Sequence, residues 1–227
     1  MASLLNNPEN VLFFDIETSG IEKDFSHLSD REKDLFTKRF KKRSSNGVYW
    51  GGTTPEEAFV NKSPIIPIFG KIVCISLGYI KNGEIKTKSF TGEECDILKN
   101  SSVHFNNANN LQWSLCGFNI KNFDLPWINH KFIKYDIKMP YFISLIGKKP
   151  WELNIFDLFE YVTSNTDYPS FDEMCYEWNI TSPKTEMSGD KVHEYFWSGR
   201  INEISKYCEN DVKACVEMYI KIYESQI

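Results

Sequence analysis

Short apolar runs alternate along this chain with longer stretches of helical periodicity, a pattern typical of an α/β domain built on a central sheet. The run from Val11 to Phe14 ends at Asp15, which predicts a central strand buried on both faces that stops at a polar site. The runs Lys71 to Ile80 and Glu84 to Phe90 flank Asn82-Gly83. Because that dipeptide tolerates the positive φ values of a tight hairpin turn, these two strands should pair antiparallel and make the sheet mixed.

The remaining apolar segments predict a five-stranded sheet flanked by helices. Two more strands are expected at Leu111 to Phe118 and at Leu153 to Phe156. Ser170 followed by Glu173 has the spacing of a capping box, which marks the start of a helix at Phe171. Helices are predicted at Glu93 to Asn100, Leu125 to Tyr135, Asp157 to Thr163, Phe171 to Trp178, Asp190 to Trp197 and Ile201 to Glu224.

The segment from Ile21 to Gly70 is polar and has no sustained period. We interpret it as an insertion in a single domain that spans residues 1–227, with a helix near Glu32 to Lys42. A basic run from Lys33 to Arg43 carries enough cations to bind a nucleic-acid backbone. The ordinary alternative is the solvated face of a helix.

Composition bounds the class of protein. A chain of 227 residues, 41% of them hydrophobic, is long enough for one well-packed core. A net charge of -5 gives no global signal for nucleic acid, so any polyanion must be held locally. No apolar run approaches the ~20 residues of a membrane span, and no secretory signal opens the chain. We therefore expect a cytoplasmic protein, in a bacterial or phage-infected cell. Six cysteines without a CxxC pair, and four scattered histidines, favour reduced structural thiols over a zinc site.

Asp15 and Glu17 are two residues apart, so on a strand both side chains point to the same face. Two neighbouring carboxylates repel each other unless a cation lies between them. The alternative is that the strand has already ended and that both residues are solvated in a loop.

The last predicted helix places another carboxylate at a position where burial would be costly. Asp211 falls on the apolar stripe of that helix, and Tyr207 lies one turn earlier on the same side. The stripe consists of Ile204, Cys208, Cys215, Met218 and Ile222. A buried carboxylate calls for a cation or a strong hydrogen-bond donor. A stripe-edge aspartate paired with a lysine is the alternative.

A fourth carboxylate, Asp124, precedes Leu125-Pro126, where an N-cap role is sufficient to explain it. Asn119 follows the end of a strand, which is consistent with either a turn residue or a substrate contact. Asp157 is interpreted as a helix N-cap.

Together these residues resemble the three motifs of the DEDD superfamily of 3′-5′ exonucleases. DIET begins at Asp15, GFNIKNFD ends at Asp124, and YCEND runs from Tyr207 to Asp211. The tyrosine four residues before the last aspartate marks the tyrosine branch, called DEDDy. Within it, the second motif is similar to the exonuclease domain of family B DNA polymerases, here in stand-alone form. The resemblance implies a ribonuclease H-like fold.

The resemblance also implies two-metal-ion hydrolysis of phosphodiesters. Asp15, Glu17, Asp124 and Asp211 would hold two divalent ions, Mg²⁺ with Mn²⁺ as a substitute, and Tyr207 would orient the attacking water. Further family positions place Thr18, Asn119, Phe123 and Lys184 at the substrate, although Lys184 is equally explained as an exposed loop residue. The expected substrate is single-stranded DNA or a 3′ DNA end, released as nucleoside 5′-monophosphates, with a replication or repair protein as a possible partner.

Three alternative functions have to be compared with this sequence. A haloacid-dehalogenase-type phosphatase requires Asp-x-Asp, whereas the second acid here is Glu17. A non-catalytic nucleic-acid-binding module could keep the fold, but the full carboxylate set with Tyr207 argues against lost activity. An exoribonuclease of the same superfamily would share the motifs, and Phe123 favours DNA.

Overall fold

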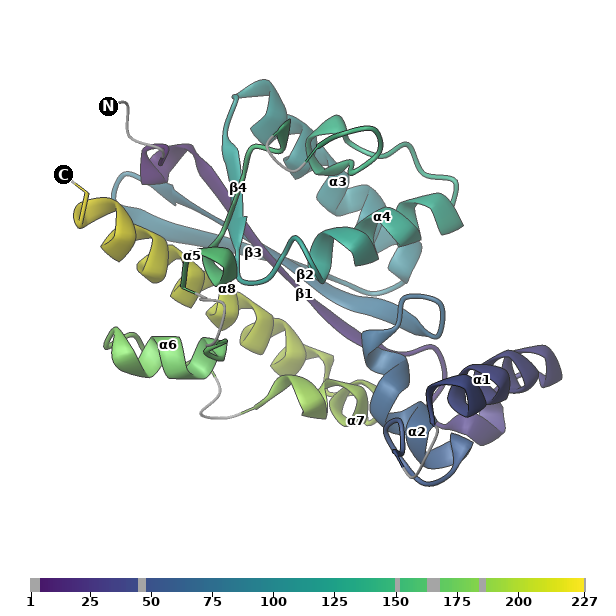
Figure 1. Cartoon of the computed structure of the whole chain (residues 1–227). Coiled ribbons are helices and arrows are strands. Elements are labelled where there is room, and N and C mark those ends of the chain that lie inside the picture. The colour runs from purple at the N-terminus through teal and green to yellow at the C-terminus, as the bar shows by residue number, and fades with distance from the viewer. Residues whose placement is uncertain (1–4, 45–47, 150–151, 163–167, 184–186, 227) are drawn as a thin grey trace.

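A mixed sheet with the strand order β3-β2-β1-β4-β5 lies at the centre of the computed structural model (Figure 1). The structure describes residues 5–44, 48–149, 152–162, 168–183 and 187–226. The strands are β1 (Val11–Gly20), β2 (Gly70–Lys81), β3 (Glu84–Thr91), β4 (Ser114–Gly117) and β5 (Ile155–Asp157). β1, β2 and β3 pair antiparallel, whereas β4 and β5 add parallel to β1. The predicted ribonuclease H-like fold, with a five-stranded mixed sheet, is confirmed.

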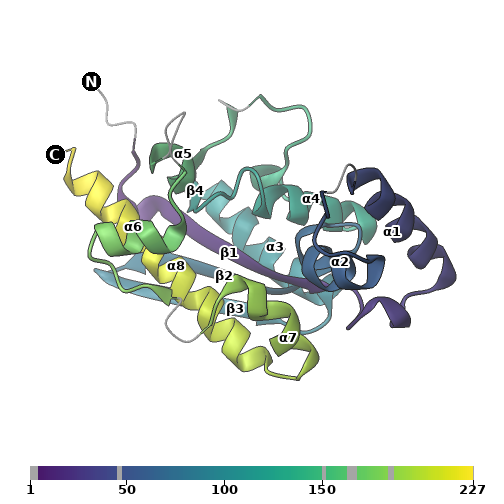
Figure 2. The same cartoon turned by 60° about the horizontal axis from the view of Figure 1, so that its bottom comes forward.

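Helices cover both faces of the sheet (Figures 1 and 2). α3 (Glu94–Asn110) and α4 (Asp124–Lys134) pack on one face, and α8 (Ile201–Glu224) packs on the other. Successive residues of β1 point to opposite layers: the Phe14 ring lies 5.5 Å from Phe105 of α3, and the Phe13 ring lies 5.5 Å from Tyr219 of α8. Odd-numbered residues of β1 therefore face α8.

β1 is longer than predicted. The strand continues through Asp15 and Glu17 to Gly20, because β2 pairs with it as far as Gly20 opposite Gly70. The ladder satisfies the backbone of these polar residues, which the sequence pattern alone cannot indicate. The interpretation of Asp15 and Glu17 as solvated loop residues is wrong.

The boundary between α3 and β4 also differs from the prediction. α3 extends to Asn110, ten residues beyond the predicted end, and β4 begins at Ser114 instead of Leu111. The added turns are mostly polar, so periodicity gives little signal there, but Phe105 and Ala108 are buried and fix the helix on the sheet.

The other helices follow the predictions closely. α8 has the predicted bounds, and the Ser170–Glu173 capping box is present at the start of α6. The hairpin turn at Asn82 and Gly83 has φ values of 54° and 74°. The shorter helices are α5 (Leu158–Val162), α6 (Phe171–Glu177) and α7 (Val192–Trp197), the last preceded by a 3₁₀ turn at Gly189–Lys191.

The 21–70 segment contains two helices, α1 (Asp30–Arg43) and α2 (Pro55–Lys62), which lie together beyond the end of β1 (Figures 1 and 2). The helix predicted at Glu32 to Lys42 is thereby confirmed. The segment has its own buried cluster, in which the Phe36 ring lies 5.2 Å from Phe59 and 5.0 Å from Phe69. It is therefore a structured unit joined to the sheet.

All six cysteines are free thiols, and five of them are buried. Within the described residues, no helix has the length and apolar character to cross a membrane.

Candidate metal-dependent active site

The position of α8 over the sheet is set by a row of small residues on β2 and β3. Gly78 of β2 leaves room for the helix, since a Cβ atom there would lie 2.5 Å from Cγ1 of Val212. On β3, the Ser89 hydroxyl donates a 2.7 Å hydrogen bond to the Glu209 carboxylate. These contacts flank residue 211 in sequence and hold this part of α8 close to the strands.

A pocket of about 250 Å³ opens between α8, β1 and the start of α4. It brings together the four carboxylates and the tyrosine that the sequence motifs indicate, although three chain segments far apart supply them. The lining residues are Asp15, Ile16, Glu17, Phe118, Asn119, Phe123, Asp124, Phe171, Tyr207, Asp211 and Cys215.

Asp124 is placed by the strand it faces. Its carboxylate accepts a 3.0 Å hydrogen bond from the backbone N–H of Ile16, between the two acids of β1. The N-cap position of α4 is Phe123, with no side-chain capping bond, so the interpretation of Asp124 as an N-cap is wrong. Asp211 is 8% exposed on the buried face of α8.

The carboxylates perturb one another. Burial, followed by the charges of Asp211 and Asp124, raises the pKa of Asp15 well above its usual range. Burial, followed by the charge of Asp15, raises the pKa of Glu17 in the same way. Burial raises the pKa of Asp124 to about 8, although the Ile16 amide opposes this shift. Burial, with the charges of Asp211 and Glu17, also raises the pKa of Tyr207.

This donor set fits divalent cations. No lysine or arginine lines the described pocket, so the carboxylates have no cationic side chain there to offset their repulsion. Hard divalent ions prefer carboxylate oxygens. Ligand atoms of Asp15, Glu17 and Cys208 lie within 4.8 Å of one another.

Sequence reasoning did not place Cys208 at the site. Its thiol donates to the Asp15 carboxylate over 3.2 Å. Burial raises the pKa of the Cys208 thiol, which favours its protonated form as the donor to Asp15. Its position next to Tyr207 in the third motif was the available signal.

The expected substrate residues divide into three groups. Asn119 and Phe123 line the pocket. Thr18 is not among the lining residues, and its hydroxyl donates a 2.5 Å hydrogen bond to the carbonyl of Pro64 in the 21–70 segment. Lys184 lies outside the described residues.

Asp157 does more than cap α5. Its carboxylate accepts hydrogen bonds from the backbone N–H groups of Asn119 at 2.7 Å and Lys121 at 2.9 Å, in addition to Phe159 at 3.0 Å. Asn119 has a φ of 60°, a conformation that non-glycine residues adopt only with local support. Asp157 therefore fixes the loop that carries Asn119 to the pocket wall, a role that sequence spacing does not indicate.

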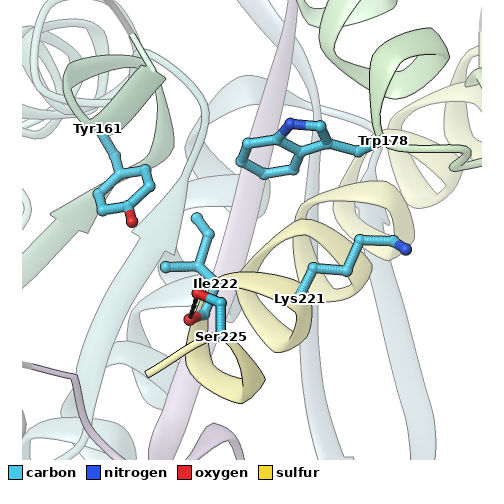
Figure 3. Close-up of a pocket in the computed structure, with 5 residues that line it drawn as sticks. All are labelled: Tyr161, Trp178, Lys221, Ile222 and Ser225. Atoms are coloured by element: carbon cyan, nitrogen blue, oxygen red, sulfur yellow. Dashed lines mark hydrogen bonds between the residues drawn. The ribbon is translucent and has the colours of Figure 1, made fainter. Parts of the chain in front are cut away.

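A larger cavity of about 360 Å³ lies at the C-terminal end of α8 (Figure 3). Tyr161, Trp178 and Ile222 supply its apolar wall, with Lys221 and Ser225 beside them. Ile222 is about 16 Å along the helix axis from Asp211. No carboxylate lines the described part of this cavity, so it is separate from the carboxylate pocket.

Comparison with known proteins identifies the family. Residues 65–226 match the family described as "Predicted 3'-5' exonuclease related to the exonuclease domain of PolB". The chain belongs to this family. The PolB-related match begins after Asp15 and Glu17, which the sheet brings to the pocket. Membership of this exonuclease family implies dependence on a metal, which the donor set fits.

Among solved structures, the chain is similar to E. coli Exonuclease I in complex with a dT13 oligonucleotide, with a TM-score of 0.37 and 14% identity. That match covers 92% of this chain and 39% of the Exonuclease I chain, so this chain spans well under half of that protein. No curated protein matches this PolB-related chain.

Proposed function

We propose that this protein is a metal-dependent 3′-5′ exonuclease of the tyrosine branch of the DEDD superfamily. The observation that carries the proposal is the convergence of Asp15, Glu17, Asp124 and Asp211 on one pocket, with Tyr207 in its wall. Carboxylates that raise one another's pKa are stabilised as anions by cations. Paired divalent ions held by carboxylates are a recurrent solution for phosphodiester hydrolysis.

In this proposal, Asp15, Glu17, Asp124 and Asp211 would hold the two divalent ions. The bound ions, Mg²⁺ or Mn²⁺, supply Lewis-acid stabilisation of the phosphoryl oxygens and lower the pKa of water. Tyr207 orients the attacking water, because its ring projects from α8 into the same pocket as the carboxylates. Cys208 holds the Asp15 carboxylate in place through its thiol.

The substrate in this proposal is the 3′ end of single-stranded DNA, released as nucleoside 5′-monophosphates. A pocket of about 250 Å³ is small for a ligand site, which suits a single terminal nucleotide. The aromatic side chains of Phe118, Phe123 and Phe171 line it and offer stacking surfaces for a base. Asn119, at the same wall, would contact the sugar or base of that nucleotide.

The test is a time course on DNA and RNA strands that carry a label at either the 3′ or the 5′ end, with Mg²⁺, Mn²⁺ or chelator. We expect metal-dependent release of mononucleotide from the 3′ end, faster on DNA. Asp15→Ala should abolish release, whereas Glu84→Ala, which removes an exposed carboxylate of β3, should not. Faster trimming of RNA would assign an exoribonuclease, and internal cleavage would contradict an exonuclease. Binding without any metal-dependent trimming would assign a binding module.

A further inference from the structure

The catalytic pocket alone provides little attraction for a polynucleotide. It is lined by four carboxylates and, among the described residues, by no lysine or arginine. Bound metal ions would attract the terminal phosphate, but the phosphates further along the strand would meet no cation there. A polymer substrate therefore needs cations elsewhere on the protein.

We propose that the C-terminal half of α1 binds the backbone of the substrate strand upstream of its 3′ end. The inference rests on the proposed function for the identity of the strand. We call the exposed residues Lys41, Lys42, Arg43 and Tyr49 the α1 surface.

Charge distinguishes this region from the rest of the chain. Residues 21–70 contain nine lysines and arginines against seven acids, whereas the remainder contains 17 against 24. Within α1, the acids Asp30 and Glu32 lie in the first turn and the cations Lys41, Lys42 and Arg43 lie in the last turn. The positive charge is thus concentrated at one end of one helix.

These cations are available to a ligand. Lys38 is paired with Asp34 at 2.8 Å, but no described carboxylate lies within ion-pair distance of Lys41, Lys42 or Arg43. The Trp50 amide donates a 3.0 Å hydrogen bond to the hydroxyl of Ser44, directly after Arg43, and so brings the neighbouring Tyr49, with 63% of its surface exposed, close to the end of α1. Cations beside an exposed aromatic ring are the combination that proteins use to hold single-stranded nucleic acid without reading its sequence.

The α1 surface is fixed relative to the carboxylates. The 21–70 segment begins four residues after Glu17 and lies beyond the carboxyl end of β1 (Figures 1 and 2). Two hydrogen bonds tie it to the active-site scaffold: the Thr18 hydroxyl to the Pro64 carbonyl at 2.5 Å, and His193 of α7 to the Lys23 carbonyl at 2.8 Å. A strand held by α1 would therefore keep a defined position relative to the pocket.

The test compares the triple variant Lys41→Gln/Lys42→Gln/Arg43→Gln with a control that loses the same charge, Lys81→Gln/Lys86→Gln/Lys88→Gln on the β2–β3 hairpin. Binding of a fluorescent single strand of about 20 nucleotides is measured by anisotropy in chelator, over a range of salt concentrations. We expect the α1 variant to bind roughly tenfold more weakly and to lower the slope of log K against log salt by about 2, since each single-strand phosphate contact contributes about 0.7. The hairpin variant should match the wild type. Equal binding by all three proteins, or equal loss in both variants, would overturn the proposal.

Hydrolysis of the p-nitrophenyl ester of thymidine 5′-monophosphate separates this inference from the proposed function. The ester is too small to reach α1, so the α1 variant should hydrolyse it at the wild-type rate while its KM for the long strand rises. Loss of ester hydrolysis in the α1 variant would overturn the proposal. A wild-type protein that hydrolyses neither substrate would refute the exonuclease function, and the anisotropy result would still decide the α1 surface. The charge-conserving variant Lys41→Arg/Lys42→Arg/Arg43→Lys should keep wild-type binding; if it loses binding, charge is not the cause.

Discussion

The two halves of α8 lie over the same strand and make opposite kinds of contact. In the C-terminal half, the Tyr219 ring lies 5.5 Å from Phe13 and 5.4 Å from Phe156, inside an apolar cluster. In the N-terminal half, Tyr207 and Asp211 share a pocket with the acids of β1. The change from apolar to acidic side chains occurs along one face of β1, whose successive residues are Val11, Phe13, Asp15 and Glu17.

The difference between the two halves explains how the fold holds together carboxylates that repel one another. Burial of large apolar side chains stabilises by about 1.5 to 3 kcal/mol each, and those of the C-terminal half fix the helix against the sheet. The rigid helix then carries Asp211 to β1 at a cost that the apolar contacts exceed. The residues of the proposed chemistry thus occupy one stretch of a helix that apolar contacts hold in place along its length.

The test with the largest expected effect compares single substitutions at Asp15 and Phe13, two positions apart on the face of β1 that points to α8. Asp15→Asn should lower kcat/KM by about 10³-fold or more, because it removes a proposed metal ligand. It should also raise the Tm in chelator, because one buried anion among several is removed. Phe13→Leu should lower the free energy of unfolding by about 1 to 2 kcal/mol and leave kcat/KM nearly unchanged. If Asp15→Asn lowers the chelator Tm as much as Phe13→Leu does, the division between the two halves is wrong.

Stability should depend on pH and metal together. The folded state raises the pKa of Asp124 from 3.8 to about 8, so its protonated form stabilises the metal-free fold fully below pH 3.8, and this contribution is lost as the pH rises to about 8. Asp15 and Glu17 shift in the same direction. Mg²⁺ at about 100 times its Kd should add about 3 kcal/mol.

Calorimetric scans at pH 5 and pH 8, with Mg²⁺ or chelator, measure this dependence. The increase in Tm caused by Mg²⁺ should be larger at pH 8, where the metal competes with fewer protons. The same increase at both pH values would show that the metal binds elsewhere.

Asp157→Ala tests a residue that acts on the pocket from outside α8. Removal of its carboxylate releases the backbone amides of Asn119 and Lys121, and kcat/KM should fall roughly 10- to 100-fold, since small displacements of a positioning loop have effects of that size. The increase in Tm caused by Mg²⁺ should persist, because the proposed metal ligands are intact. Asp157→Asn, which keeps one acceptor oxygen, should lower kcat/KM by less than Asp157→Ala does. A loss of the Mg²⁺ effect would show that Asp157 supports the ligands and not the loop.

Gly78→Ala addresses the junction between the two halves. The new Cβ atom would lie 2.5 Å from Cγ1 of Val212, next to Asp211, so either the Val212 side chain or α8 must shift. We expect a loss of about 1 to 3 kcal/mol in the free energy of unfolding, the usual range for overpacking. Gly189→Ala, which adds its Cβ to open space, is the matched control in denaturant titrations. Equal stability of the two variants would mean that the helix is not confined at this position.

Much of the fold follows from local signals in the sequence. The apolar stripe of α8, the capping box at Ser170 and the turn at Asn82 and Gly83 are all where those signals predict. What was missed depends on partners distant in sequence. β1 continues to Gly20 because β2 lies beside it, and α3 continues to Asn110 because Phe105 and Ala108 reach the sheet.

The candidate site shows the same division. The residue types and spacing of Asp15, Glu17, Tyr207 and Asp211 were visible in the motifs, and the structure places them in one pocket. The contacts of Asp157 span 36 and 38 residues, so no local pattern could indicate them. The environment of Asp124 depends on the Ile16 amide, which lies 108 residues away.

The pairing of Gly20 with Gly70 at the end of the β1–β2 ladder has a consequence for how this protein can vary. Topologically, everything between these two glycines is the loop of a hairpin, however elaborate its interior. The entropy of closing such a loop grows only slowly with its length, so its content can change without altering the register of the strands. The length and content of residues 21–70 can therefore change while the carboxylates of β1 keep their positions relative to β2.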